Sequence, residues 1–151
     1  MAYTDLLTKT GNRTAFNECL NREISLANRH SSPLSLIFLD IDHFKTINDQ
    51  YGHECGDFTL SSVADWLKEC IRTDDILFRY GGEEFVILLS DTDALGAELL
   101  AKRICTHIEQ HSLNYGAKQL KITASLGIST FRKNEKNNSF LKRADAAMYQ
   151  A

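Results

Sequence analysis

Residues 75–89 read DILFRYGGEEFVILL, and this stretch decides the fold because two apolar runs flank a single glycine pair. Runs rich in Ile, Leu, Val and Phe on either side of glycines are typical of two strands joined by a tight turn. We therefore predict strands over residues 75–80 and 83–89, joined across the two-residue turn Gly81-Gly82. Glycine in this turn permits a positive φ and a close approach by a ligand.

The tip of this hairpin carries two adjacent carboxylates, Glu83 and Glu84. Paired carboxylates on a rigid turn are well placed for a divalent metal. For an isolated acidic turn, the simpler interpretation is that the charges only keep the loop soluble. The other motifs of the chain are needed to distinguish a metal site from a solvated loop.

The composition is that of one ordinary globular domain of 151 residues, large enough to bury a core without metal or disulfide support. A net charge of -3 argues against a protein that coats nucleic acid, because such proteins neutralise phosphates with a basic surface. No targeting segment and no apolar run long enough to span a bilayer is visible. We expect a cytoplasmic domain with no membrane contact from this segment, although a longer parent protein could still be tethered to a membrane.

The four cysteines are scattered through the chain, without a CxxC pair or a histidine spacing suited to zinc. We expect reduced thiols with no catalytic role. They are Cys19, Cys55, Cys70 and Cys105.

The spacing of apolar residues predicts the other elements. Helices are expected over residues 13–30, with Asn12 as N-cap, and over 44–50, 57–71, 94–111 and 139–150. Strands are expected over 34–39, where an apolar run ends at Asp40, and over 120–129. Residues 51–56, which contain two glycines, are expected to form a loop.

This order predicts an α+β fold with a ferredoxin-like βαββαβ core. In such a core the crossover helices lie on one face of a central antiparallel sheet, and the additional helices of this chain would complete a sheet surrounded by helices. The first strand and the second hairpin strand are neighbours in this topology. Asp40 should therefore lie beside Glu83 and Glu84 at one edge.

Carboxylates that converge at this edge, with Asp40 and Asp42 alternating along the strand exit, would form an oxygen-rich site suited to Mg²⁺ or Mn²⁺ rather than zinc. Lys45 and the backbone amides at the start of the 44–50 helix would cradle phosphate oxygens. Asn48 and Asp57 carry groups that complement the edge of a base. Taken singly, Asn48 and Asp57 are more simply interpreted as helix caps, and Lys45 as a solvated charge.

The joint pattern closely resembles the GGDEF family of diguanylate cyclases. The resemblance covers nearly the whole chain, and GGEEF is one of the two signature forms of active members of that family. It implies a fold similar to class III nucleotidyl cyclases and polymerase palm domains. The motifs that carry it, in order, are DLLT (5–8) with Asn12-Arg13, DIDHFK (40–45), IND (47–49), YGHE (51–54), GD (56–57), GGEEF (81–85), TASLGI (123–128) and ADAAMY (144–149).

The resemblance implies condensation of two GTP molecules to cyclic di-GMP with release of two pyrophosphates. Asp40, the carbonyl of Ile41 and Glu83 would hold Mg²⁺ or Mn²⁺, with Glu84 alongside. Glu83 is the usual candidate for the base, although a metal-bound carboxylate is a weak base. The other groups carried over are Lys45 on the phosphates, Asn48 and Asp57 on the guanine, His53 near the nucleoside, and Phe44 and Gly82 as further substrate contacts.

One domain holds one GTP, yet each 3′-hydroxyl must attack the other nucleotide. Catalysis therefore requires a homodimer of facing domains, and we expect the isolated domain to be slow and dependent on concentration.

The stretch Arg72-Thr73-Asp74-Asp75 fits the inhibitory RxxD motif of the family, and Arg103 lies where a helper arginine often occurs. The simpler interpretation is a surface Arg–Asp pair. In this context we expect Arg72, Asp75 and Arg103 to bind cyclic di-GMP, with arginine forking onto guanine N7 and O6, and to inhibit the enzyme.

The sequence also departs from the family. It stops at Gln150-Ala151, where members typically continue with a lysine and an arginine that contact the triphosphate. Losing one such contact costs about 1.5–3 kcal/mol. We interpret residues 1–151 as one GGDEF domain, excised from a longer protein and clipped at its C-terminus. The alternative to an active enzyme is a catalytically weak or inactive receptor domain for GTP or cyclic di-GMP. The net negative charge of the chain argues against a third interpretation, an RNA-binding module.

Overall fold

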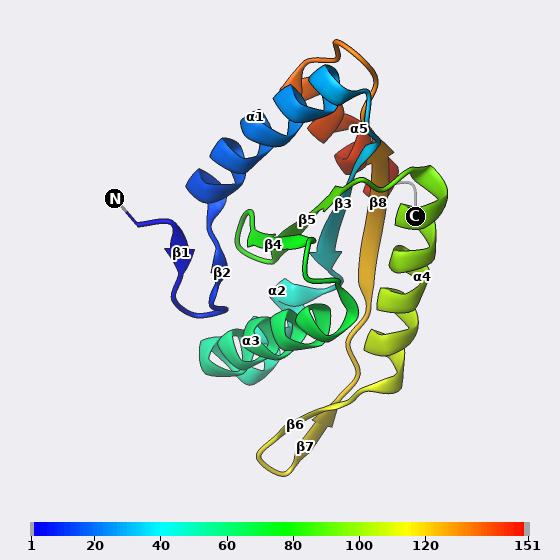
Figure 1. Cartoon of the computed structure of the whole chain (residues 1–151). Coiled ribbons are helices and arrows are strands. Elements are labelled where there is room, and N and C mark those ends of the chain that lie inside the picture. The colour runs from blue at the N-terminus through cyan, green and yellow to red at the C-terminus, as the bar shows by residue number, and fades with distance from the viewer. Residues whose placement is uncertain (1, 150–151) are drawn as a thin grey trace.

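The computed structural model describes residues 2–149 (Figure 1). The predicted helix, strand, two helices, hairpin, helix, strand and helix occur in that order, with further short strands among them. The helices are α1 (Arg13–His30), α2 (Phe44–Tyr51), α3 (His53–Cys70), α4 (Ala94–Gln110) and α5 (Asn137–Tyr149). The strands are β1 (Thr4–Asp5), β2 (Thr10–Gly11), β3 (Leu34–Ile41), β4 (Ile76–Arg79), β5 (Glu84–Ser90), β6 (Leu113–Tyr115), β7 (Lys118–Leu120) and β8 (Ala124–Thr130).

The main sheet has the strand order β1-β2-β4-β5-β3-β8. Strand β3 lies between β5 and β8 and is antiparallel to both, and β4 and β5 form an antiparallel hairpin. β3, the α2–α3 crossover, this hairpin, the α4 crossover and β8 make up the predicted βαββαβ core. The ferredoxin-like prediction is confirmed. The parallel contact of β2 with β4 makes the complete sheet mixed.

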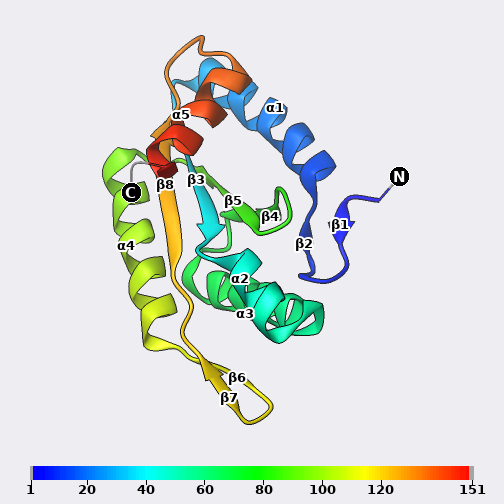
Figure 2. The same cartoon turned by 180° about the vertical axis from the view of Figure 1, so that it is seen from behind.

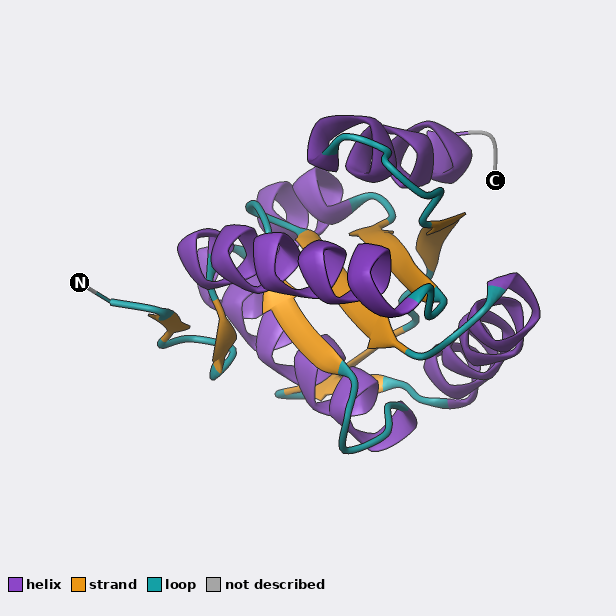
Figure 3. Ribbon diagram, turned by 45° about the horizontal axis from the view of Figure 1, so that its top comes forward, coloured by secondary structure: helices purple, strands orange, loops and turns teal. Residues whose placement is uncertain are grey.

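Alternating side chains along the strands divide the apolar core between the two faces of the sheet. Ile37 and Ile87 belong to the cluster under α3 and α4, whereas Phe38 and Val86 belong to the cluster under α1 and α5. Figures 2 and 3 show helices on both sides of the strands. The crossover helices therefore share one face, as predicted, and the helices outside the βαββαβ core cover the other.

Helix α1 begins where the sequence predicts, because the side chain of Asn12 accepts a hydrogen bond from the amide of Ala15 at 3.0 Å. It ends at His30, and Ser31 follows with a left-handed φ of 53°.

Helix α5 packs against β8 backbone to backbone at Gly127. A Cβ on this glycine would lie 2.0 Å from the carbonyl oxygen of Ala144 and 2.3 Å from the amide nitrogen of Met148. Any other residue would push α5 away from the sheet. The predicted end of this helix, Gln150, and the terminal Ala151 lie outside the described residues.

The predicted loop over residues 51–56 and the predicted helix start at Asp57 are wrong. Helix α3 begins at His53, and Gly52, with a φ of 93°, separates it from α2. Gly56 lies buried within α3 instead of in a turn. A Cβ there would collide with the side chain of Asn48 on α2, so this glycine serves the close packing of two helices.

The predicted strand over residues 120–129 is wrong in extent, because it divides into β7 and β8. β7 pairs with β6 across a turn at Gly116, which has a φ of 61°. Figures 1 and 2 show this hairpin, the β6–β7 arm, projecting beyond α3 and α4. The two-residue strands β1 and β2 were not predicted either.

The four cysteines are free in the described chain, as expected for reduced thiols. None of the helices within residues 2–149 has the length and apolar character needed to cross a membrane.

Candidate active site

Three carboxylates gather where β3 ends beside β5. Asp40 is opposite Glu84 in the antiparallel register, and the amide of Ile41 donates a hydrogen bond to the carbonyl oxygen of Glu83 at 3.2 Å. Directly opposed residues present their side chains on the same face of a sheet. The pairing of β3 with β5 therefore brings Asp40 beside the two glutamates, as predicted.

Two of these carboxyls, Asp40 and Glu84, have a raised pKa. Burial, followed by the charges of Glu83 and Glu84, raises the pKa of Asp40 to about 6. Burial also raises the pKa of Glu84, with a further contribution from Glu83. An all-oxygen donor set that is short of positive charge suits a hard divalent cation. The residues present fit Mg²⁺ or Mn²⁺.

Asp145 of α5 belongs to this acidic cluster, and the sequence analysis missed it as a site residue. Its charge contributes to the raised pKa of both Asp40 and Glu84. Its Oδ1 is buried and has no hydrogen-bond partner among the described residues. The predicted topology could have suggested Asp145, because α5 follows β8 in the chain and β8 is the neighbour of β3 in the sheet.

The loop between β4 and β5 is not the predicted two-residue glycine turn. The amides of Tyr80 and Gly81 both donate to the carbonyl of Glu84, at 2.8 and 3.3 Å, so residues 80–83 form the loop. Neither Gly81 nor Gly82 has a positive φ. Gly81 instead provides space, because a Cβ there would lie 2.4 Å from Oε1 of Glu84. Gly82 is exposed, and a Cβ there would meet nothing within 4 Å.

Arg79 fastens this loop to the N-terminal strands, a role that the sequence analysis did not identify. Its Nη2 donates to the carbonyl of Gly82 at 2.9 Å, and its Nε lies 3.3 Å from the carbonyl oxygen of Gly81. Its Nη1 pairs with Asp5 at 3.2 Å. Asp5 in turn accepts from the amide and hydroxyl of Thr8. The β1–β2 segment therefore braces the carboxylate loop through one guanidinium.

A cleft of about 380 Å³ opens at this edge, which is within the size range of small-molecule sites. His43, the N-cap of α2, has a φ of 57° and makes no side-chain capping bond within residues 2–149, so its side chain leaves the first amides of α2 uncapped there. Lys45 follows and is exposed. The lining residues are Asp40, Ile41, Asp42, His43, Phe44, Lys45, Glu83, Ser125, Met148 and Tyr149.

Asp42 differs from Asp40 in having hydrogen-bond partners. Its carboxylate accepts from the hydroxyls of Thr123 and Ser125, at 2.8 and 2.7 Å. Asp42 lies one residue beyond the end of β3 and is held by Thr123 and Ser125, whereas Asp40 stays beside the glutamates.

Phe44 and Asn48 lie together where α2 meets α3. A Cβ on Gly56 would be 1.8 Å from Oδ1 of Asn48 and 3.3 Å from the ring of Phe44. That Oδ1 is buried without a hydrogen-bond partner among the described residues, which costs about 1–3 kcal/mol unless a donor arrives. His53 and Asp57 are exposed at the start of α3 and do not line the cleft.

Arg72, Asp75 and Arg103 line a second pocket, of about 320 Å³. The buried carboxylate of Asp75 accepts from the amide of Arg72 at 2.9 Å and from its guanidinium at 3.3 Å. The guanidinium also donates to Thr92, yet the Arg72 side chain remains 60% exposed. Arg103 donates to the carbonyl of Cys70. Asp75 therefore positions Arg72, and the arginines face the pocket.

Comparison with known proteins gives one consistent result. The family model described as "Diguanylate cyclase, GGDEF domain" matches residues 2–151. Diguanylate cyclase DgcP of Pseudomonas aeruginosa is 41% identical over 150 residues, and diguanylate cyclase A of Treponema denticola is 37% identical over 155. The alignments cover 99% and 100% of this chain but 22% and 42% of those proteins, so the chain spans less than half of their length.

Solved structures agree with the sequences. The GGDEF domain of DgcB from Caulobacter crescentus, solved in complex with c-di-GMP, superposes with a TM-score of 0.95 at 33% identity and covers 99% of this chain and 87% of that one. The active GGEEF domain of a diguanylate cyclase from Vibrio cholerae superposes with a TM-score of 0.85 at 33% identity, covering 93% and 89%. The fold around the cleft is thus the fold of these domains.

Proposed function

Because the chain belongs to the GGDEF family of diguanylate cyclase domains, we propose that it condenses two GTP molecules into cyclic di-GMP and releases two pyrophosphates. The observation that carries this proposal is the meeting of Asp40 with Glu83 and Glu84 beside the first turn of α2. Transfer of a nucleotidyl group demands positioning and charge neutralisation more than covalent chemistry from the protein.

The carboxylate edge is the proposed cation site, for Mg²⁺ or Mn²⁺. Asp40, the carbonyl of Ile41 and Glu83 would hold the ion, and Glu84 would add negative charge beside them. When bound, the ion lowers the pKa of the attacking 3′-hydroxyl and neutralises charge on the leaving pyrophosphate. The raised pKa of Asp40 supports this assignment, because a cation would relieve the crowding of like charges.

The protein groups around that edge have complementary tasks in our proposal. Lys45 and the first amides of α2 bind the phosphates, since exposed amides at a helix N-terminus attract anions. Glu83 is the candidate acceptor for the proton of the 3′-hydroxyl, although binding to the cation would make it a weak base, and Glu84 acts beside it as a charge partner of the cation. The exposed backbone of Gly82 permits a close approach by the substrate.

The guanine would be read beside α2. The unpartnered Oδ1 of Asn48 is a ready acceptor for an N–H of the base, and the ring of Phe44 is its immediate neighbour. Asp57 follows Gly56 directly and would accept from the same base edge, with His53 near the nucleoside.

One cleft holds one nucleotide in this proposal, so the two 3′-hydroxyls and two α-phosphates meet only when two domains face each other. The active unit would be a homodimer in which each chain supplies one half of the reaction.

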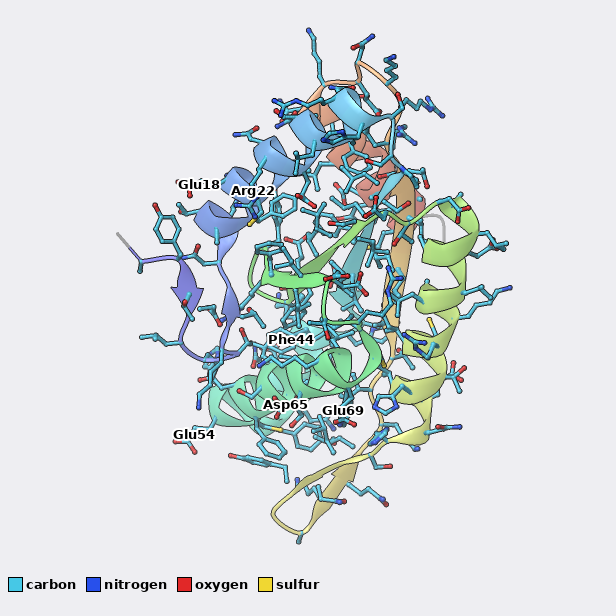
Figure 4. The ribbon with its side chains drawn as sticks, viewed as in Figure 1. Glu18, Arg22, Phe44, Glu54, Asp65 and Glu69 are labelled. Atoms are coloured by element: carbon cyan, nitrogen blue, oxygen red, sulfur yellow. The ribbon has the colours of Figure 1, made fainter. Side chains whose placement is uncertain are left out.

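The test is to incubate the chain with GTP and Mg²⁺ and to detect cyclic di-GMP by mass spectrometry. We expect product from the natural sequence, none from Glu83→Ala, and normal yield from Asp65→Ala. Asp65 is a matched acidic control because it is exposed on α3 (Figure 4) and is not among the residues that line the cleft. Absence of product from the natural sequence at high protein concentration would contradict the proposal.

The pocket of Arg72 and Arg103 is proposed as the product site, with Asp75 as its positioning residue. Cyclic di-GMP offers guanine N7 and O6 acceptors that match an arginine fork. The structure of DgcB with c-di-GMP supports product binding by a domain of this fold. Binding there would inhibit the enzyme.

Calorimetry tests this assignment. Arg72→Ala should weaken cyclic di-GMP binding about ten- to a hundredfold, since each such arginine contact contributes about 1–3 kcal/mol. Arg22→Ala, which removes an exposed arginine of α1, should leave the affinity unchanged. Unchanged affinity in Arg72→Ala would refute the site.

The same pocket supports the second candidate function, a receptor for cyclic di-GMP with weak or no turnover. Product binding by a chain that forms no product from GTP would favour the receptor over the enzyme.

A further inference from the structure

We propose that Glu69, His107 and His111 form a zinc-binding site on the surface between the ends of α3 and α4, apart from the carboxylate edge. Each residue offers one ligand atom, and these atoms all lie within 4.8 Å of one another. Figure 4 shows Glu69 on α3 near α4. The site joins residues that are 38 positions apart in the sequence.

The donor set selects the kind of metal. Two imidazoles and one carboxylate are a typical three-ligand set for Zn²⁺, with a fourth position left for water. Mg²⁺ prefers an all-oxygen shell, so it belongs at the carboxylate edge. The two histidines are four residues apart at the end of one helix, a spacing that places their side chains on the same face.

The geometry is close to that of a bound ion. Nε2 of His107 lies 3.2 Å from Oε2 of Glu69. Two ligands bound tetrahedrally at the usual Zn–N and Zn–O lengths are about 3.3 Å apart. The widest separation in the group exceeds this by at most about 1.5 Å. Glu69 can close such a gap by rotation, because its side chain is 56% exposed.

The ring of His111 is already oriented. Its Nδ1 lies 2.6 Å from the carbonyl oxygen of His107, and only a protonated Nδ1 can donate to that oxygen. The neutral ring therefore carries its lone pair on Nε2, the tautomer that metal-binding histidines adopt when a carbonyl holds their other nitrogen. The rings of His107 and Trp66, at centroid distances of 4.3 and 5.2 Å, restrict its rotation.

The location also favours a cation. His107 is in the last turn of α4 and His111 is its C-cap residue, where the helix dipole presents its negative end. An ordinary ion pair between His107 and Glu69 accounts for two of the three residues but gives no role to His111. The sequence alone does not suggest this group, because only the two histidines are close in the chain and the carboxylate ligand comes from another helix.

Titration of the metal-free full chain with Zn²⁺ tests the proposal, with Mg²⁺ in excess to occupy the carboxylate edge. We expect one Zn²⁺ per chain by calorimetry, and at least about tenfold weaker binding in His107→Ala, in His111→Ala and in Glu69→Gln. His30→Ala removes an exposed histidine of α1 and should bind like the natural chain. Matching melting curves without zinc would show that the variants are folded.

Co²⁺ serves as a spectroscopic probe of the same site. A four-coordinate visible spectrum that His111→Ala abolishes and Glu83→Ala retains would support the site. A thiolate-to-cobalt charge-transfer band would assign the metal to a cysteine instead. Binding that is lost in Glu83→Ala but kept in the histidine variants would place the ion at the carboxylate edge. Either result overturns the proposal.

Discussion

Asp40 remains charged at neutral pH although its surroundings oppose the charge. Burial and four neighbouring acids raise its pKa to about 6, whereas an aspartate in an unfolded chain titrates near 3.9. A carboxyl whose pKa is raised by folding lowers the stability of the native state once the pH exceeds the unfolded pKa, and the full penalty is present above the folded pKa. Asp40, which we propose as a ligand of the cation, thus lowers the stability of the metal-free domain.

We therefore predict that Asp40→Asn melts at a higher temperature than the natural chain near neutral pH without divalent metal. The advantage should shrink as the pH falls from about 6 towards 4, because Asp40 then becomes protonated in the folded state. The variant should form no cyclic di-GMP. Thermal melts with and without Mn²⁺ check this, since Mn²⁺ should stabilise only the natural chain. A lower melting temperature for the variant near neutral pH would contradict the explanation.

Single residues show where sequence reasoning stops. Asp40, Glu83 and Asn48 were nominated as site residues by the joint pattern of motifs around them, because each residue type taken singly has a simpler interpretation. Arg79 was missed because Asp5, the carboxylate that holds it, is distant in the sequence, and Asp145 because Asp40 and Glu84 are distant from it. Gly56 was interpreted as part of a loop because the sequence does not distinguish a glycine required by a turn from one required by close packing of two helices.

At the scale of elements, the position of α5 depends on its connection to β8. Glu135, in the connector, accepts two hydrogen bonds of 2.7 Å from the guanidinium of Arg143 and one from Ser139. Arg143 also donates to the carbonyl of Thr130 at the end of β8. The hydrogen bonds from Arg143, with smaller contributions from the Arg132 amide and Ser139, lower the pKa of Glu135 to about 2.

A carboxylate whose pKa is lowered by folding stabilises the native state above its unfolded pKa, and this stabilisation disappears as the pH falls through the folded value. We predict that Glu135→Gln lowers the free energy of unfolding by about 1–3 kcal/mol near neutral pH. The difference should narrow below about pH 4.5 and vanish near pH 2.

Urea unfolding of both proteins across this range is the measurement. Glu98→Gln, which alters an exposed glutamate of α4, should show no such narrowing. A difference for Glu135→Gln that stays constant with pH would mean that the ion pair is not its source.

The helices and strands that apolar spacing predicted are those that bury a continuous stripe of apolar side chains, in a helix, or an apolar run, in a strand. The βαββαβ order was predictable because each of its elements packs on the sheet. Strands β1 and β2 have two residues each, too few for any period to show. The arm was missed because alternation continues from Leu120 into β8, so nothing in the pattern marks residues 121–123 as a break.

At the scale of the whole molecule, each chain has one cleft at the sheet edge, and in our proposal this cleft binds only one of the two GTP molecules that react. We predict that the specific activity of the isolated chain falls on dilution, because encounter of two domains limits the rate. Measuring cyclic di-GMP formation over a wide range of protein concentration tests this. Fusion to a dimeric coiled coil should flatten the dependence, and a specific activity of the unfused chain that stays constant on dilution would contradict the dimer.

The β6–β7 arm offers a practical use. Its base is held by Leu113 and Leu120, which are buried, and by the contact of Tyr115 with Phe58. Its tip at Gly116 and Ala117 is exposed, and neither core cluster includes it. A fluorophore or surface linker attached there would label or immobilise the domain without touching either pocket.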